Sequence, residues 1–289
     1  MRTIESLKAN SLADLTDLVI FSDGPKRESD QHNIIQIRQY LRELKGFKKI
    51  HLVERTQNFG LSKSIIQGVT EVVASYEKVI VLEDDMITSP YFLHFMNKGL
   101  QRYDTEDKVI SVHGYVYPAK EHLPETFFLR GADCWGWATW KRGWDLFDQD
   151  GAKLLSRLAA QKLFKRFDMD GAYPYAQMLR NQVAGKNDSW AIRWHASAFL
   201  ANKLTLYPGK SLVRNIGIDS SGTHCPTSDC YDSPLSNQPI TVKDIEIVES
   251  EMALQAFMHF LHVASKKNFR SKVGSILKSI VRGGHIEKH

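Results

Sequence analysis

Three consecutive acidic side chains, Glu83, Asp84 and Asp85, directly follow a short apolar run at residues 79–82. A run of this length and β-branched character indicates a strand buried on both faces. Carboxylates crowded at the end of such a strand repel one another and lose hydration, and both effects raise their pKa. A divalent cation removes both costs, because carboxylate oxygens are hard ligands suited to Mg²⁺ or Mn²⁺. The pattern predicts a cation site, with a solvent-facing acidic loop as the alternative.

The elements that would position this triplet alternate between strand and helix over the first 130 residues. Short β-branched runs predict strands, and apolar residues three and four apart predict helices. Strands separated by helices favour an α/β fold with a mostly parallel, twisted sheet and right-handed crossovers, whose ligands bind at the carboxyl ends of the strands. The predicted strands are residues 18–21, 49–53, 79–82 and 109–112, and the predicted helices are residues 30–44, 61–76 and 90–103.

The pattern changes after residue 131, where four tryptophans with small residues between them suit either the wall of a ligand site or a packed core. These are Trp135, Trp137, Trp140 and Trp144. Farther along, we predict helix in residues 151–182, a helix that begins near Ser189, a strand at 204–207, a long loop at 215–239 and a last helix at 243–262. The chain therefore divides into a main domain, residues 1–242, and a basic helical extension, residues 243–289.

The composition is that of an ordinary globular protein, with 289 residues, 43% hydrophobic and 25% charged. A formal net charge of +5 is too small to mark a dedicated nucleic-acid binder, so no nucleic-acid partner is expected. Three cysteines are too few for a disulfide framework, and the start of the chain lacks the layout of a signal peptide. No run of 18 apolar residues occurs that could span a membrane. These features predict a cytoplasmic protein.

Residues 266–282 carry six basic side chains and no acidic one, with apolar residues between them near helical spacing. A basic amphipathic helix of this kind can lie on an anionic membrane surface. The alternative is a solvated helix packed on the domain. The sequence thus makes peripheral contact with the inner face of the membrane one of two readings of this segment.

Several short motifs, taken together and in order, resemble the glycosyltransferases of the GT-A fold, a Rossmann-like class. The branch most similar to this chain contains N-acetylglucosaminyltransferase I and the related bacterial family-2-like sugar transferases. The resemblance covers residues 12–225, and its motifs are FSDGP (21–25), NFGLSK (58–63), VIVLEDD (79–85) with SPYF (89–92), WGW (135–137), NDSW (187–190) and residues 215–224.

This resemblance assigns the acidic triplet to a metal site. In the family, the last acid binds Mn²⁺, or Mg²⁺, held by the nucleotide diphosphate, and here that acid is Asp85. A late histidine, matched by His224, completes the metal site or contacts the diphosphate. The two preceding acids, Glu83 and Asp84, orient the donor sugar and the ribose. The cation stabilises the charge that develops on the departing diphosphate.

The resemblance also assigns roles outside the triplet, each with an ordinary structural alternative. Asp23 matches the acid that accepts a hydrogen bond from the uracil ring, but it also suits turn capping. Lys63 would contact the diphosphate or the base, or it is a solvated charge. Asp188 matches the general base that deprotonates the acceptor hydroxyl, and it also suits a helix N-cap. Trp135 and Trp137 would lie against the donor sugar, or pack in the core.

The resemblance implies a metal-dependent, inverting glycosyltransferase that acts in glycan or cell-surface polysaccharide biosynthesis. It would transfer a sugar from a nucleotide sugar, a UDP-sugar, to a hydroxyl of a glycan or a lipid-linked acceptor. The family opens with a strand and loop that have no match ahead of residues 1–7, which leaves the activity of this chain open. Two other readings remain: a nucleotidyltransferase, and an inactive or carbohydrate-binding relative.

Overall fold

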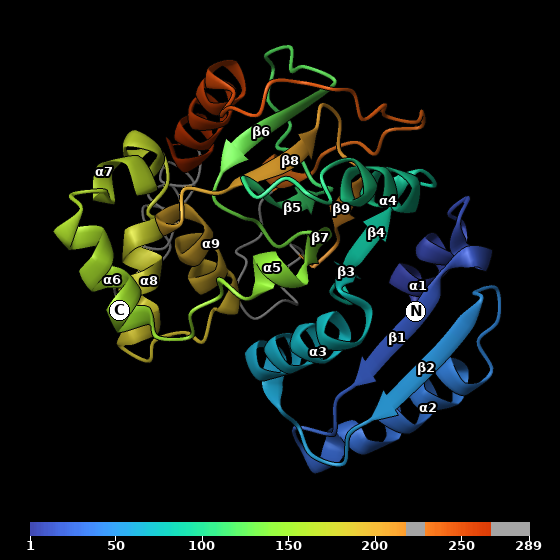
Figure 1. Cartoon of the computed structure of the whole chain (residues 1–289). Coiled ribbons are helices and arrows are strands. Elements are labelled where there is room, and N and C mark those ends of the chain that lie inside the picture. Colours follow the sequence, from blue (N-terminus) through green and yellow to red (C-terminus); the bar gives the residue numbers. More distant parts are fainter. Residues whose placement is uncertain (218–228, 267–289) are drawn as a thin grey trace, which may run out of the picture.

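A computed structural model describes residues 1–217 and 229–266 of the chain (Figure 1). The strands are β1 (Asp17–Ser22), β2 (Lys49–Glu54), β3 (Lys78–Val81), β4 (Met86–Thr88), β5 (Val109–His113), β6 (Thr126–Arg130), β7 (Trp137–Trp140), β8 (Leu204–Pro208) and β9 (Val213–Asn215). The α-helices are α1 (Arg2–Lys8), α2 (Gln31–Arg42), α3 (Gly60–Tyr76), α4 (Phe92–Arg102), α5 (Lys141–Trp144), α6 (Gly151–Ala160), α7 (Phe164–Phe167), α8 (Tyr175–Val183) and α9 (Trp190–Leu200). Residues 251–266 are also helical.

A five-stranded sheet with the strand order β3-β7-β5-β8-β6 lies at the centre of the fold. Within this sheet, β5 and β8 run parallel, whereas β3–β7, β5–β7 and β6–β8 are antiparallel pairs. Two smaller sheets accompany it: β1 and β2 form a parallel pair, and β4 and β9 form an antiparallel pair. The protein is therefore a mixed α/β fold with a central sheet flanked by helices, as Figure 1 shows.

The prediction of a mostly parallel sheet is wrong for the central sheet, and β6 and β7 are the reason. Residues 137–140 read as part of an aromatic cluster, because Trp-Ala-Thr-Trp lacks the β-branched run that marks the other strands. In the structure all four residues are buried, and β7 runs antiparallel to both β3 and β5. Two of the four tryptophans, Trp137 and Trp140, thus belong to a strand inside the central sheet.

Helices cover both faces of the central sheet. On one face, α4 packs Leu93, Met96 and Leu100 against Val112 of β5 and Leu206 of β8 in a buried apolar cluster. The three α4 residues are spaced three and four apart, which places them on one side of the helix. This stripe fixes α4 against the sheet directly behind the loop that holds the acidic triplet.

The opposite face of the sheet is covered by α3 and α9. Val69 and Val73 of α3 and Trp194 of α9 pack in one buried cluster with Val81 of β3 and Trp137 of β7. Because successive residues of a strand point to opposite faces, Trp137 joins this cluster while its neighbour in sequence lies in the other one. The two helices thereby meet over the end of β3, where the acidic triplet begins.

The C-terminal helix of the described chain belongs to the same core. Leu254 and Phe257 pack against Phe127 of β6 and Tyr207 of β8. The predicted helix at 243–262 is displaced, since residues 251–266 are helical and residues 243–248 are not. Part of the predicted extension 243–289 therefore packs directly on the main domain. All but the first residue of the basic segment 266–282 lies outside the described residues.

Most other predicted elements are confirmed with shifts of one or two residues at their ends, including all five predicted strands. The exception is the long helix predicted at residues 151–182, which is three shorter helices, α6, α7 and α8. Asp170, between α7 and α8, has a φ of 53°, and this left-handed conformation interrupts a right-handed helix. Among the described residues, no helix is both long and apolar enough to cross a membrane.

Candidate active site

The acidic triplet lies in a tight loop between β3 and β4. The chain turns here through a hydrogen bond from the Met86 amide to the Glu83 carbonyl. Two distant segments hold the loop: the Thr3 hydroxyl donates to the Asp84 carbonyl, and the Ile216 amide donates to the Asp85 carbonyl at 2.8 Å. The triplet is therefore fixed from the start of the chain on one side and from the segment after β9 on the other.

The carboxylates of this loop destabilise one another. Burial, together with the charges of Asp85 and Asp84, raises the pKa of Glu83 to about 8. Burial and the charge of Asp84 also raise the pKa of Asp85. The Oδ1 atom of Asp85 is buried and has no hydrogen-bond partner in the described part of the chain. An unpaired buried carboxylate oxygen beside two other acids suits a divalent cation, which would supply the missing positive charge.

The described side chains do not supply a full set of ligands for such a cation. Across residues 1–217 and 229–266, no group of three or more His, Cys, Asp or Glu side chains could hold a metal ion. His224, the predicted partner of Asp85, lies outside the described residues. Gly217 lies so close to Asp85 that a Cβ added there would be 2.4 Å from Oδ2. A side chain at this position would fill the space beside the carboxylate.

Asp188 precedes α9 and faces solvent. Ser189 is the N-cap of the helix, since its side chain accepts a hydrogen bond from the Ile192 amide. The alternative role predicted for Asp188, helix capping, is thus taken by its neighbour. The Asp188 side chain is 76% exposed, and its Oδ1 atom lies 3.1 Å from a guanidinium nitrogen of Arg193, whose side chain is 8% exposed. Asp188 is an accessible carboxylate held by a buried cation.

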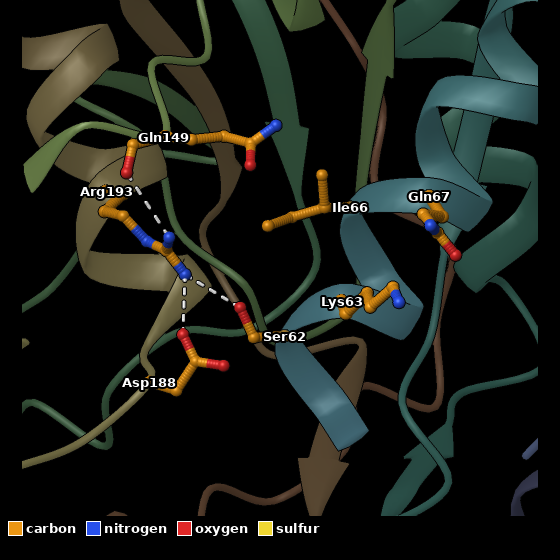
Figure 2. A pocket seen from close by; sticks show the side chains of 7 residues that line it. All are labelled: Ser62, Lys63, Ile66, Gln67, Gln149, Asp188 and Arg193. Atoms are coloured by element: carbon orange, nitrogen blue, oxygen red, sulfur yellow. Dashed lines mark hydrogen bonds and ion pairs between the residues drawn. The ribbon is translucent and has the colours of Figure 1, made fainter. Parts of the chain in front are cut away.

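A pocket of about 360 Å³ opens between α3 and α9, with Asp188 at its edge. Figure 2 shows Arg193 on one side of the pocket, bonded to Ser62, Asp188 and the backbone of Gln149. The volume falls in the range of small-molecule sites. The lining residues are Ser62, Lys63, Ile66, Gln67, Gln149, Asp188 and Arg193.

Trp190 joins the Asp188 segment to the acidic triplet. It is the first residue of α9, is 2% exposed, and forms a side-chain hydrogen bond with Glu83 that partly offsets the rise in the Glu83 pKa. The candidate base therefore lies two residues from a side chain that contacts the first acid of the triplet. The start of α9 and the end of β3 form one connected site.

Asp23 follows β1 and caps the start of α3. Its carboxylate accepts hydrogen bonds from the amides of Phe59, at 2.8 and 2.9 Å, and Gly60, at 3.0 Å. The alternative predicted for Asp23 is capping of its own Asp-Gly-Pro turn, whereas the carboxylate instead caps a helix that begins 37 residues later in the chain, at Gly60. A carboxylate has about four lone-pair sites, so one more donor can still bind. Lys63, in the first turn of α3, is exposed and lies 4.3 Å above the Phe59 ring.

The two tryptophans predicted to contact the donor sugar differ in the structure. Trp137 is fully buried, and its ring packs against Trp144, Trp190 and Trp194. The prediction is wrong for Trp137, because a central strand position between two covered faces leaves the indole no open side. Trp135 is half-buried and packs edge-on against Tyr115 at a centroid distance of 4.6 Å. It therefore keeps a surface that a ligand can reach.

Sequence analysis did not single out Ser62, Gln149 or Arg193. The sequence does contain a hint of the role of Arg193. This residue lies five positions after Asp188, one turn into the helix, where a long arginine side chain can reach back to an acid before the helix. Ser62 and Gln149 carry no such signal, because only the packing of α3 on α9 brings them to Arg193.

Arg193→Met is expected to lower the free energy of unfolding by about 2–4 kcal/mol, because it leaves the buried Ser62 hydroxyl and the Gln149 and Ser189 carbonyls without their donor. Urea denaturation of wild type and variant measures the change. Arg157→Met, on the exposed side of α6, is the matched control and should change stability by less than about 0.5 kcal/mol. Equal stability of the two variants would contradict the bonding role given to Arg193.

The region thus combines a loop of crowded acids after β3, an exposed carboxylate held by a buried arginine, and a pocket between α3 and α9 with that carboxylate at its edge. The crowded acids lack a positive partner among the described side chains, and Asp188 is a carboxylate that a ligand in the pocket can reach. The chain matches no model of a known protein family, and no curated protein is significantly similar to it.

Proposed function

We propose that the chain is a metal-dependent, inverting glycosyltransferase that transfers a sugar from a UDP-sugar to a hydroxyl of a glycan or lipid-linked acceptor. The observation that carries this proposal is the pairing of two unlike carboxylate environments within one site. Glu83 and Asp85 are half-buried in one loop and have raised pKa values, whereas Asp188 is exposed and held by Arg193. A site that needs both a cation and a base requires two such environments.

Asp188 is the residue proposed to remove the proton. In an inverting transfer, the acceptor hydroxyl attacks the anomeric carbon while the bond from that carbon to the diphosphate breaks. The base takes the hydroxyl proton as the new bond forms. The Asp188 carboxylate suits this task because it is reachable from the pocket and because the hydrogen bond from Arg193 fixes its orientation.

Asp85 is the residue proposed to hold the cation, and Glu83 and Asp84 are proposed to orient the donor. A bound Mn²⁺ or Mg²⁺ would stabilise the negative charge on the departing diphosphate. The buried, unpaired Oδ1 atom of Asp85 supports this assignment, as does the pKa of Glu83, which burial and two neighbouring acids raise to about 8. Asp84 is exposed in the same loop, where it can accept hydrogen bonds from the hydroxyls of the donor.

The nucleotide is proposed to lie along the start of α3. Asp23 caps this helix, and its remaining lone pairs can accept from the ring N–H of a uracil. Lys63 lines the pocket and supplies a positive charge near the diphosphate. Ser62, one residue earlier, is uncharged, and its hydroxyl accepts a hydrogen bond from Arg193 that links this region to α9.

Release of UDP tests this proposal. The protein is incubated with UDP-glucose, UDP-galactose and their N-acetylated forms, each with Mn²⁺ or with EDTA, and free UDP is measured. We expect release from at least one donor that rises with added methyl glycoside acceptors and falls to background in EDTA. Release that is unchanged by EDTA would contradict the metal role, and no release from any donor with any acceptor would contradict the proposed activity.

A further inference from the structure

A second polar cluster lies around Asp133 and contains none of the carboxylates assigned a role in the proposed function. Asp133 stands between β6 and β7 with its side chain 29% exposed. His113, at the end of β5, lies beside Asp133, and the ring of Tyr207 in β8 packs on His113 at a centroid distance of 5.0 Å. The charge of Asp133 also acts on two half-buried tyrosines, Tyr117 and Tyr175. We call these five residues the Asp133 cluster.

His113 is the unusual member of this cluster. Its side chain is fully buried, and neither ring nitrogen has a hydrogen-bond partner in the described part of the chain. The Nε2 atom faces the Asp133 carboxylate at 3.7 Å, which is too long for a hydrogen bond. Burial lowers the pKa of His113 and favours the neutral ring. A buried polar group without a partner is costly, and a ligand hydroxyl beside Asp133 would reduce that cost.

The tyrosines place several hydroxyls near the same carboxylate. Burial raises the pKa of Tyr117, Tyr175 and Tyr207 well above the usual value, and the charge of Asp133 adds to this rise in all three. Tyr117 and Tyr175 also share a side-chain hydrogen bond. The cluster therefore offers a charged acceptor together with phenolic donors, and its neutral hydroxyls remain protonated at any physiological pH.

The rings of the cluster are also suited to a ligand with an apolar face. Trp135 is half-buried and packs edge-on against Tyr115 at a centroid distance of 4.6 Å, whereas the Tyr117 ring is stacked on Phe260 at 5.1 Å and offers its hydroxyl rather than its face. Aromatic faces of this kind contact the C–H surface of a sugar ring, while hydroxyl and carboxylate groups bind its edge. Mixed aromatic and polar character of this sort matches a carbohydrate better than a phosphate or an apolar ligand.

Three connections place the Asp133 cluster close to the candidate active site. Gly136 lies against Leu82, the residue before Glu83, and Asp133 is three residues from Gly136, a reach of at most about 11 Å. On α9, His195 bonds to the carbonyl of Ala132, and it follows Trp190 by five residues, about 8 Å along the helix. In the sheet, His113 pairs with Trp137 of β7, which pairs with Val81 at the end of β3, so the cluster lies two strand spacings, about 10 Å, from the strand end that leads into the acidic loop.

We propose that the Asp133 cluster binds a sugar ring of the acceptor, with the Asp133 carboxylate accepting hydrogen bonds from ring hydroxyls, the Tyr117 hydroxyl bonding to the sugar edge, and Trp135 contacting the face of the ring. The binding itself follows from the cluster alone. The identity of the bound sugar as the acceptor rests on the proposed glycosyltransferase function.

Saturation-transfer NMR on the whole protein tests this binding. The probes are the methyl glycosides of glucose, galactose, mannose and N-acetylglucosamine, without nucleotide or metal. We expect transfer to at least one glycoside, and Asp133→Asn should weaken its binding about tenfold or more, since hydrogen bonds to a charged group are lost. Asp107→Asn, an exposed acid in the loop before β5, is the matched control and should bind as the wild type does.

A second variant and a competition experiment complete the test of the sugar site. Tyr117→Phe removes one hydroxyl and should weaken binding about fivefold, so it tests the site even if Asp133→Asn loses its fold by circular dichroism. A competition with UDP and Mn²⁺ should leave the glycoside bound. The inference is overturned if no glycoside binds, if Asp133→Asn and Tyr117→Phe both bind like the wild type, or if UDP displaces the glycoside.

The result also separates this inference from the proposed function. Glycoside binding by a protein that binds no nucleotide would contradict the glycosyltransferase proposal and leave the sugar site standing. Metal-dependent UDP release by a protein that binds no glycoside would contradict the sugar site alone.

Discussion

Asp188→Ala is expected to lower the rate of sugar transfer by a factor of about 10² to 10⁴, the range typical of a lost general base. The affinity for UDP in the presence of Mn²⁺ should stay the same, because Asp188 lies outside the acidic loop proposed to hold the cation and its exposed side chain is paired with Arg193. Transfer rates at saturating donor and acceptor, together with calorimetric titration of UDP, measure the two quantities.

Asp188→Asn separates the proton-accepting role from the contact with Arg193. An asparagine oxygen can still accept the hydrogen bond from Arg193, but an amide is no base, so this variant should be as slow as the alanine variant. Asp107→Ala, away from the site, should transfer sugar at the wild-type rate. If Asp188→Asn keeps near-normal transfer, Asp188 only positions Arg193 and another group removes the proton.

Glu83→Gln is expected to raise the stability of the metal-free protein by several kcal/mol at pH 8 and by nothing near pH 4. Burial and the charges of Asp85 and Asp84 raise the pKa of Glu83 from 4.5 to about 8 in the folded protein. Between these values, the unfolded chain releases the proton that the folded chain retains. Stability therefore falls as pH rises through this window, by about 1.4 kcal/mol for each pH unit.

Glutamine has the shape of the protonated acid and is neutral at every pH. The stability of the variant should therefore not fall as the pH rises. The measurement is urea denaturation of both proteins in EDTA at pH 4, 6 and 8, read as the difference between them at each pH. Glu71→Gln, on the exposed side of α3, is the control and should give a difference that does not depend on pH. Parallel curves for wild type and Glu83→Gln would show that Glu83 is not held in its protonated form.

The strands of this fold were accessible to sequence reasoning where they are apolar and β-branched. β1, β2, β3, β5 and β8 are of this type, and each was predicted within a residue or two. β7 was not, because Trp137 and Trp140 look equally suited to a helix or a ligand wall, and only the tertiary pairing with β3 and β5 makes a strand of them. Missing this strand also produced the wrong expectation of a mostly parallel sheet.

The candidate site was predictable where the chemistry is local in sequence. Three adjacent acids after a strand predict electrostatic repulsion between their carboxylates. The raised pKa values of Glu83 and Asp85 agree with this prediction. Arg193 and Trp190 reach their partners through the packing of α9 on α3 and β3, which no short motif encodes. For the same reason the sequence could not assign Trp137 to the core and Trp135 to the surface.

Thermal unfolding with nucleotides tests the central claim most directly. The wild type and Asp85→Asn are each heated with UDP, GDP, CMP or dTDP, with and without Mn²⁺. A ligand at 100 times its Kd adds about 2.7 kcal/mol of stability, a rise in Tm of roughly 5–10 °C. We predict this rise for the wild type with UDP and Mn²⁺ together, and its loss in Asp85→Asn. No rise with any nucleotide, or an equal rise in Asp85→Asn, would contradict a cation-dependent nucleotide site at the acidic loop.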